Sequence, residues 1–192
     1  MPRIEPVPMD HFDPETRELL QGFVAQGRTS STTFARIVAY HTKLFQGLVQ
    51  SVASREFGGL LGPRLRELVR LRSAQIGGCD ECTRARYSNE VREDEIACMV
   101  VGTDQNLDPR ERLALRYVTL MHTDHHRIDR AFYIELKRLF TTAEIVELGM
   151  LTATLLGQHR LLHTLDILGD EAPAISFDKA EIDAEHRQAV AA

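Results

Sequence analysis

Apolar residues recur along the chain at spacings of three and four, the period of an amphipathic helix, and strand-like alternation is nowhere convincing. The clearest stripe lies toward the C-terminal end. Six positions there share one helical face: Ile145, Leu148, Thr152, Leu155, His159 and Leu162. We predict that this helix lies across the core or at an interface.

Helix boundaries are marked by capping residues and glycines. Three predicted helices follow a capping side chain: Asp13 with Pro14, Asp108 with Pro109 and Glu111, and Thr141 with Glu144. Glycines at 58–59, 77–78 and 102 provide stops, because glycine adopts the left-handed backbone that often ends a helix. These signals predict helices over residues 13–26, 31–40, 42–56, 63–76, 79–91, 93–101, 109–123, 129–139 and 142–168. The predicted fold class is all-α, a helical bundle.

We expect this bundle to be a single domain over residues 1–170. Segments 34–48 and 132–140 are loosely alike, since each is an aromatic and apolar run after an Asp-Pro-capped helix, and they hint at an internal pseudo-repeat. Residues 171–192 form a polar C-terminal tail with little apolar surface to bury. This tail is expected to pack on a neighbouring subunit or to hang free.

Composition and charge narrow the function classes. The 192-residue chain has a formal net charge of −5, and its basic residues are scattered among acidic ones, so nucleic acid is not an expected partner. No apolar run reaches the roughly 20 residues of a membrane span, and the first residues lack the apolar core of a secretory signal. No phosphate-binding glycine loop or dinucleotide fingerprint occurs. We predict a cytoplasmic protein with no membrane partner and no cofactor.

Cys79 and Cys82 are separated by two residues at a predicted helix start, a spacing that permits a reversible disulfide. The helix start favours a thiolate, and the flanking charges act both ways: Arg84 and Arg86 stabilise it, whereas Asp80 and Glu81 oppose it. Two other interpretations stay open. In the first, the pair is half of a zinc site, although the only remaining cysteine is Cys98. In the second, the two are ordinary buried cysteines. Cys98 lies in an apolar run and is expected in the core.

The run over residues 63–82, with Glu67 on one helix and Cys79-Asp-Glu-Cys82 opening the next, resembles the core motif of the alkylhydroperoxidase D and carboxymuconolactone decarboxylase family. The N-terminal lead, residues 107–140 and residues 157–165 are similar to the longer, peroxidase-related members. The resemblance covers residues 3–170. It implies an all-α fold of the alkylhydroperoxidase D type and a homo-oligomer, as a dimer, trimer or hexamer.

The resemblance also implies roles for three residues. Cys82 would be the peroxidatic thiol, Cys79 its resolving partner, and Glu67 part of a proton relay toward the pair. The alternative for Glu67 is a surface ion pair with Arg64 or Arg70.

The chain departs from the family pattern at one place. Redox-active members carry a histidine three or four residues after the second cysteine, where this chain has Ala85 and Arg86. An arginine stays protonated, so Arg86 can hold a thiolate or an anionic substrate but cannot act as a base.

The histidines offer further candidates. His122, His125 and His126 cluster at a predicted helix end, where we favour capping and solvent exposure over metal binding. His159 and His163 stand four residues apart on the last helix, a spacing that allows two imidazoles to meet one ion. We favour His159 as a hydrogen-bonded core residue and predict no metal site.

Two side chains remain as candidates near the cysteines. By resemblance the last helix lines the pocket beside them, so His159 is a candidate for the missing base. Tyr87 follows Cys82 by about one helical turn and is a candidate hydrogen-bond donor, although helix packing explains it as well.

Three functions fit these observations. The leading hypothesis is a peroxiredoxin-type oxidoreductase, in which Cys82 reduces a hydroperoxide, condenses with Cys79 and is reset by a cellular dithiol reductant. The second is a non-redox decarboxylase, lyase or isomerase acting on a carboxylated small molecule. There Arg86 would grip the carboxylate, and Glu67 or His159 would move the proton. The third is a non-catalytic oligomeric scaffold.

Overall fold

The computed structural model of the chain describes residues 2–25, 31–57, 59–96 and 106–167. Over these residues the secondary structure is helical and no strand is found. Two short 3₁₀ helices, η1 (Met9–His11) and η2 (His125–Arg127), accompany α1 (Pro14–Ala25), α2 (Thr33–Val38), α3 (Thr42–Phe57), α4 (Gly62–Ile76), α5 (Asp80–Arg84), α7 (Pro109–Thr123), α8 (Arg130–Leu139) and α9 (Thr142–Thr164). The predicted all-α fold class is confirmed.

Helices α7 and α9 begin at the capping residues that the sequence indicates. The Asp108 carboxylate accepts from the Glu111 amide at 2.8 Å, and the Glu111 carboxylate accepts from the Asp108 amide at 3.0 Å. Thr141 and Glu144 form the same reciprocal pair at 3.3 and 2.7 Å. Each pair satisfies amides that have no partner inside the helix, so local sequence determines both starts.

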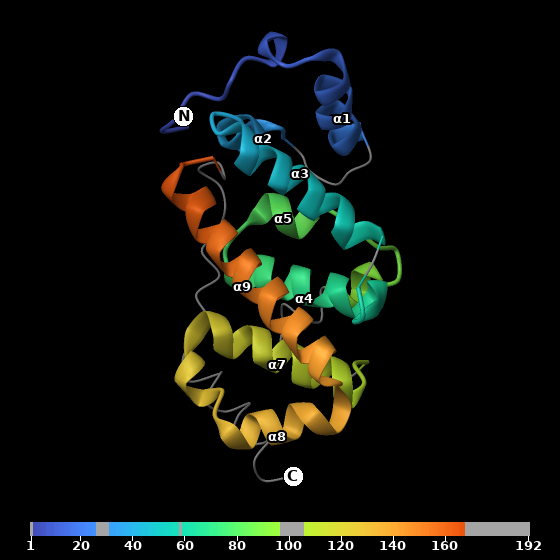
Figure 1. The fold of residues 1–192 in the computed structure, drawn as a ribbon. Coiled ribbons are helices and arrows are strands. Elements are labelled where there is room, and N and C mark those ends of the chain that lie inside the picture. Colours follow the sequence, from blue (N-terminus) through green and yellow to red (C-terminus); the bar gives the residue numbers. More distant parts are fainter. Residues whose placement is uncertain (1, 26–30, 58, 97–105, 168–192) are drawn as a thin grey trace.

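Helix α4 lies at the centre of the molecule, where it contacts α5, α7 and α9 (Figure 1). Helices α1, α2 and α3 lie toward one end, α7 and α8 lie toward the other, and α9 runs across α4 and α7. The main hydrophobic core joins α4, α7, α8 and α9, with members such as Leu65, Val69, Val118, Leu136 and Leu148. A second cluster packs on another face of α4 and contains Leu68, Leu71, Val91, Ile96, Leu107 and Leu115.

The stripe predicted near the C-terminal end is the buried face of α9. All six of its positions are buried, whereas Val146, Met150 and Leu161 on the same helix are exposed. The prediction that this helix lies across the core is confirmed. Because His159 belongs to the buried stripe, α9 carries an imidazole into the interior.

Helix α4 differs from an ordinary amphipathic helix because it also buries polar side chains. Glu67, Arg70, Arg72, Ser73 and Gln75 are each at most 8% exposed. Such groups need partners inside the protein, because a buried polar group without one costs about 1–3 kcal/mol. Arg72 Nε donates to Thr119 Oγ1 on α7 at 3.1 Å. Polar contacts as well as apolar packing therefore hold α4 in place.

The helix predicted over residues 79–91 is wrong in its second half, because α5 ends at Arg84. The cause is a tertiary contact. The Arg70 guanidinium donates to the carbonyl oxygens of Cys82 at 2.5 Å and Ala85 at 2.6 Å. A continuing helix would use these carbonyls for its own hydrogen bonds to residues four positions later. A side chain of α4 thus takes the acceptors that α5 needs to continue.

Helix α9 ends at Thr164, earlier than the predicted residue 168. Asp166 adopts a left-handed φ of 56°, which aspartate tolerates better than most residues. The Arg3 amide donates to the Leu165 carbonyl at 2.9 Å, and the Arg3 guanidinium donates to the Thr164 carbonyl at 2.8 Å. The N-terminal segment therefore satisfies carbonyls at the end of the last helix.

Three predictions concern residues outside the described ranges. They are the second half of the helix over 93–101, the core position of Cys98, and the polar tail over 171–192. Residues 93–96 are described and are helical.

Among the described helices, none is by itself long and apolar enough to cross a membrane. Within the described part of the chain, one pair of helices, α8 and α9, passes that test when taken together, and the two are bent by 117° relative to each other.

Candidate functional site

Cys79 lies just after α4, where a glycine motif ends the helix. Gly78 has a left-handed φ of 63°. The Cys79 amide donates to the Ala74 carbonyl at 3.0 Å, and the Gly78 amide donates to the Gln75 carbonyl at 3.2 Å. This is the Schellman pattern, in which glycine is favoured at the left-handed position. It turns the chain sharply and leaves Cys79 only 1% exposed.

Cys79 and Cys82 form a disulfide, with sulfurs 2.07 Å apart and Cα atoms 5.2 Å apart. The two residues differ in accessibility, since Cys79 is buried and Cys82 is half-buried. The Cys82 amide also donates to Cys79 Sγ at 3.2 Å. Cys82 is therefore the member of the pair that a molecule from solvent reaches more easily.

His159 brings a ring nitrogen to the cysteine pair from α9. That nitrogen and the two sulfurs all lie within 4.8 Å of one another. The imidazole is 2% exposed. Burial, followed by the nearby His122, lowers the pKa of His159 to about 4, so the ring is neutral at neutral pH.

Ser73 links His159 to a second histidine. Its hydroxyl lies 3.5 Å from His159 Nδ1 and 2.9 Å from His122 Nε2. Burial, followed by the charges of Arg160 and Arg72, lowers the pKa of His122 to about 4. A line of polar groups thus runs from the cysteines through His159 and Ser73 to the half-buried His122.

Of the prediction made for the three clustered histidines, solvent exposure holds for His125 and His126, which lie in η2. It is wrong for His122, because α7 turns this ring toward Ser73 on α4. His163 contacts the backbone at the end of α4. Its Nε2 donates to the Gly77 carbonyl at 2.7 Å.

Glu67 is buried, not a surface residue, and it pairs with Arg70 as one interpretation of the sequence proposed. Arg70 donates to both carboxylate oxygens, at 2.8 Å from Nε and 2.7 Å from Nη2. The Tyr87 amide donates to the same carboxylate at 3.2 Å. Because Arg70 also binds the Cys82 carbonyl, Glu67 acts on the position of Cys82 through Arg70.

The predicted cations near the cysteines each have an acidic partner. Arg86 donates through Nε and Nη2 to Glu93, both at 2.8 Å. This pairing raises the pKa of Arg86 further above its ordinary value. Arg84 pairs with Asp80 one helical turn away. These acidic partners largely balance the positive charges of Arg84 and Arg86, so the two arginines stabilise a nearby thiolate only weakly.

Tyr87 is 47% exposed, and its ring lies under the Arg70 guanidinium at 4.6 Å. This contact is a cation–π interaction and helps to hold the guanidinium against the turn that contains Cys82.

Sequence reasoning missed Ser73, and it assigned His122 to a helix cap exposed to solvent. The available signal for Ser73 was its register, because it follows Leu65 and Val69 at intervals of four residues on the face that enters the main core. A hydroxyl on such a face needs a buried partner. No comparable local signal identified that partner as a histidine 49 residues later.

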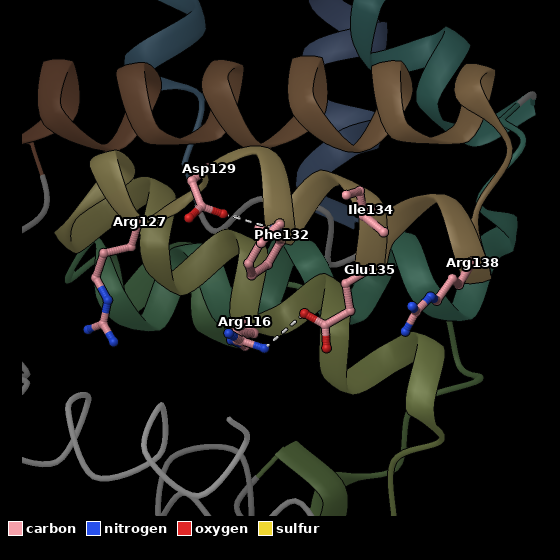
Figure 2. Close-up of a pocket in the computed structure, with 8 residues that line it drawn as sticks. Arg116, Arg127, Asp129, Phe132, Ile134, Glu135 and Arg138 are labelled. Atoms are coloured by element: carbon pink, nitrogen blue, oxygen red, sulfur yellow. Dashed lines mark hydrogen bonds and ion pairs between the residues drawn. The ribbon is translucent and has the colours of Figure 1, made fainter. Parts of the chain in front are cut away.

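A surface pocket of about 440 Å³ lies between α7, η2 and α8 (Figure 2). Its lining consists of Arg116, Arg127, Asp129, Ala131, Phe132, Ile134, Glu135 and Arg138. Arg116 pairs with Glu135 at 3.2 Å and stacks on Phe132 at 4.9 Å. None of the residues predicted for the site lines this pocket, so we do not assign it to the cysteine chemistry.

Comparisons with known proteins place this geometry in context. A search of curated proteins gives no match. Among solved structures, the chain is similar to an uncharacterized peroxidase-related protein from Silicibacter sp. TM1040, with a TM-score of 0.62 and 15% sequence identity. The similarity covers 89% of this chain and 95% of that chain, and it shows a shared fold.

The sequence model of the carboxymuconolactone decarboxylase family matches residues 40–120. This segment contains Glu67, Cys79, Cys82 and Arg86, whereas His159 lies outside it. Over residues 40–120 this chain is therefore similar to the carboxymuconolactone decarboxylase family.

Proposed function

We propose that this protein is a thiol-dependent peroxidase that reduces a hydroperoxide through Cys82 and Cys79. One observation carries the proposal: two cysteines within bonding distance of each other lie beside the buried, neutral ring of His159. Disulfide exchange and hydroperoxide reduction both need a pair that can open and close, and a group that moves a proton beside it.

The reaction consumes one hydroperoxide and forms one disulfide. The Cys82 thiolate attacks the outer peroxide oxygen, the O–O bond breaks, and the alkoxide leaves as an alcohol after taking a proton. Cys82 is then a sulfenic acid. Cys79 attacks that sulfur, water leaves, and the disulfide forms. A cellular dithiol reduces the disulfide and becomes oxidised itself.

His159 takes the place of the family histidine that Arg86 replaces. A thiolate forming beside the ring stabilises the imidazolium, because opposite charges at short range favour each other in a buried site. The ring can then return its proton to the departing oxygen. Ser73 and His122 extend this path toward the half-buried end of the polar line.

Glu67 and Arg70 act as positioning residues in this scheme. Both oxygens of the Glu67 carboxylate accept from Arg70, and Arg70 binds the Cys82 backbone. The pair therefore orients the turn that presents Cys82.

The test is a thiol titration of the reduced protein with one equivalent of an organic hydroperoxide. We expect rapid loss of two thiols and a Cys79–Cys82 disulfide in the peptide map. Cys79→Ser should stop at a sulfenic acid on Cys82 that a dimedone probe traps, whereas Cys82→Ser should not react rapidly. Cys98→Ser serves as the control for loss of a cysteine. Equal reactivity of wild type and Cys82→Ser would overturn the proposal.

The contacts of Arg86 do not favour the lyase alternative. The lyase hypothesis used Arg86 to grip a carboxylate, and that guanidinium already holds the carboxylate of Glu93 through two hydrogen bonds.

A further inference from the structure

We propose that the reduced protein binds one zinc ion through Cys79, Cys82 and His159, and that oxidation of the two cysteines releases it. The zinc site uses residues that also take part in the proposed function. Only the release of zinc on oxidation rests on that function. The binding step rests on the three ligand atoms that the fold brings together.

The geometry suits a zinc ion once the disulfide is open. Zinc holds sulfur at about 2.3 Å and imidazole nitrogen at about 2.0–2.1 Å in a tetrahedron, so its ligand atoms lie roughly 3.5–4 Å apart. The two sulfurs and the His159 nitrogen already lie within 4.8 Å of one another. The main adjustment is separation of the two sulfurs, which reduction of their bond allows.

The charge of the site also suits a divalent cation. Two thiolates and one neutral imidazole neutralise the two positive charges of zinc, so the complex adds no net charge to the interior. The nearby arginines do not oppose it strongly, because Arg70 pairs with Glu67 and Arg86 pairs with Glu93. Burial of Cys79 and His159, at 1% and 2% exposure, protects two of the three bonds from water.

Polar groups around the ligands are arranged as in a metal site. The Cys82 amide donates to Cys79 Sγ at 3.2 Å, which stabilises negative charge on that sulfur. The Ser73 hydroxyl lies 3.5 Å from His159 Nδ1 and can orient the ring. Three protein ligands leave a fourth position for water, on the side where Cys82 is half-buried.

Zinc binding and disulfide formation exclude each other, because both use the same sulfur electron pairs. Binding to the reduced pair releases two thiol protons. When a hydroperoxide oxidises the zinc-bound thiolates, they lose two electrons and join. The hydroperoxide takes these electrons and two protons, forming an alcohol and water, and zinc leaves unchanged as a divalent ion. Bound zinc would thereby protect the thiols, and its release would signal their oxidation.

The binding test uses the reduced full-length protein, zinc ion and a competing chromophoric chelator, with cobalt as a spectroscopic probe. We expect one ion per chain and a thiolate-to-cobalt charge-transfer band. Cys79→Ser, Cys82→Ser and His159→Gln should each weaken zinc binding by more than about 100-fold, and Ser73→Ala by about 10–100-fold. The disulfide form should bind no zinc. Circular dichroism checks that each variant is folded.

The matched controls are Cys98→Ser for a cysteine and His125→Gln for an exposed histidine, and both should bind zinc as wild type does. Absence of zinc binding by the reduced protein would overturn the proposal, and so would wild-type affinity in the folded cysteine variants. Loss of binding in Cys98→Ser or His163→Gln with full binding in His159→Gln would assign the ion elsewhere and overturn it too.

Hydroperoxide added to the zinc-loaded protein separates the two proposals. Release of one zinc ion per disulfide formed supports both. If zinc binds as described but hydroperoxide neither oxidises the pair nor releases the ion, the zinc site stands and the peroxidase function fails. If hydroperoxide oxidises the pair in a protein that never bound zinc, the function stands and the zinc site fails.

Discussion

Gly77 at the end of α4 and His159 on α9 are packed so closely that a Cβ atom on Gly77 would lie 2.6 Å from His159 Nδ1. Gly77 has a φ of −74°, which any residue adopts, so the need for glycine here is purely one of space. This contact sets how near α9 brings the imidazole to the cysteines.

Gly77→Ala is expected to displace His159 and to destabilise the protein by about 1–3 kcal/mol, the usual cost of overpacking a core. Disulfide formation by hydroperoxide should slow at the same time. Urea unfolding and thiol titration measure the two effects. Gly157→Ala on α9 is the control, because a Cβ there meets open space. It should be neutral or stabilise by about 0.5–1 kcal/mol. Equal destabilisation by the two substitutions would contradict the steric explanation.

Arg70→Met should be strongly destabilising, by about 3–5 kcal/mol, because it leaves the Glu67 carboxylate buried without its cation. It also frees the carbonyls of Cys82 and Ala85 from their donor. Chemical denaturation measures the change. The comparison is Arg84→Met, whose side chain is 76% exposed and whose pair with Asp80 contributes little. A small effect for both variants would show that the Glu67–Arg70 pair does not anchor the turn.

Stability should fall as the pH drops below neutrality. The pKa of His159 is about 4 in the fold and 6.5 ordinarily. Between these values the unfolded chain binds a proton that the folded chain excludes, so the free energy of unfolding decreases as pH falls from 6.5 toward 4. Over this pH range the His159 ring lowers the free energy of unfolding by about 3 kcal/mol.

Denaturant unfolding at closely spaced pH values tests this. His159→Gln should reduce the slope in that window, and the slope that remains should come in part from His122, whose pKa is also about 4. His125→Gln, which alters an exposed ring, should leave the profile as in wild type. An identical slope in His159→Gln and wild type would mean that the buried imidazole does not exclude the proton.

Asp108→Ala should destabilise the protein by about 1 kcal/mol, because it removes the cap of α7. Thr119 and His122 lie near the other end of α7. Fraying at the start of the helix should therefore lower stability without altering the site. Thermal unfolding measures it, with Asp94→Ala as the comparison for loss of an exposed carboxylate. Hydroperoxide reactivity at a temperature well below unfolding should not change. A loss of reactivity there would place Asp108 nearer to the chemistry than the fold does.

The sequence by itself determined features that depend on residues within one or two helical turns of each other. These are the starts of α7 and α9 at their capping boxes, the buried face of α9, and the cysteine pair on one turn. Each follows from hydrogen bonds or spacing inside a single segment, and for that reason a sequence pattern reveals it.

Only the tertiary structure decided which groups meet the cysteines. Ser73 and His159 are 86 residues apart, and Arg70 ends α5 by taking the carbonyl of Ala85, 15 residues further along the chain. These contacts depend on how α4, α7 and α9 pack together. The register of each helix shows which face is buried but not which residue of another helix that face meets.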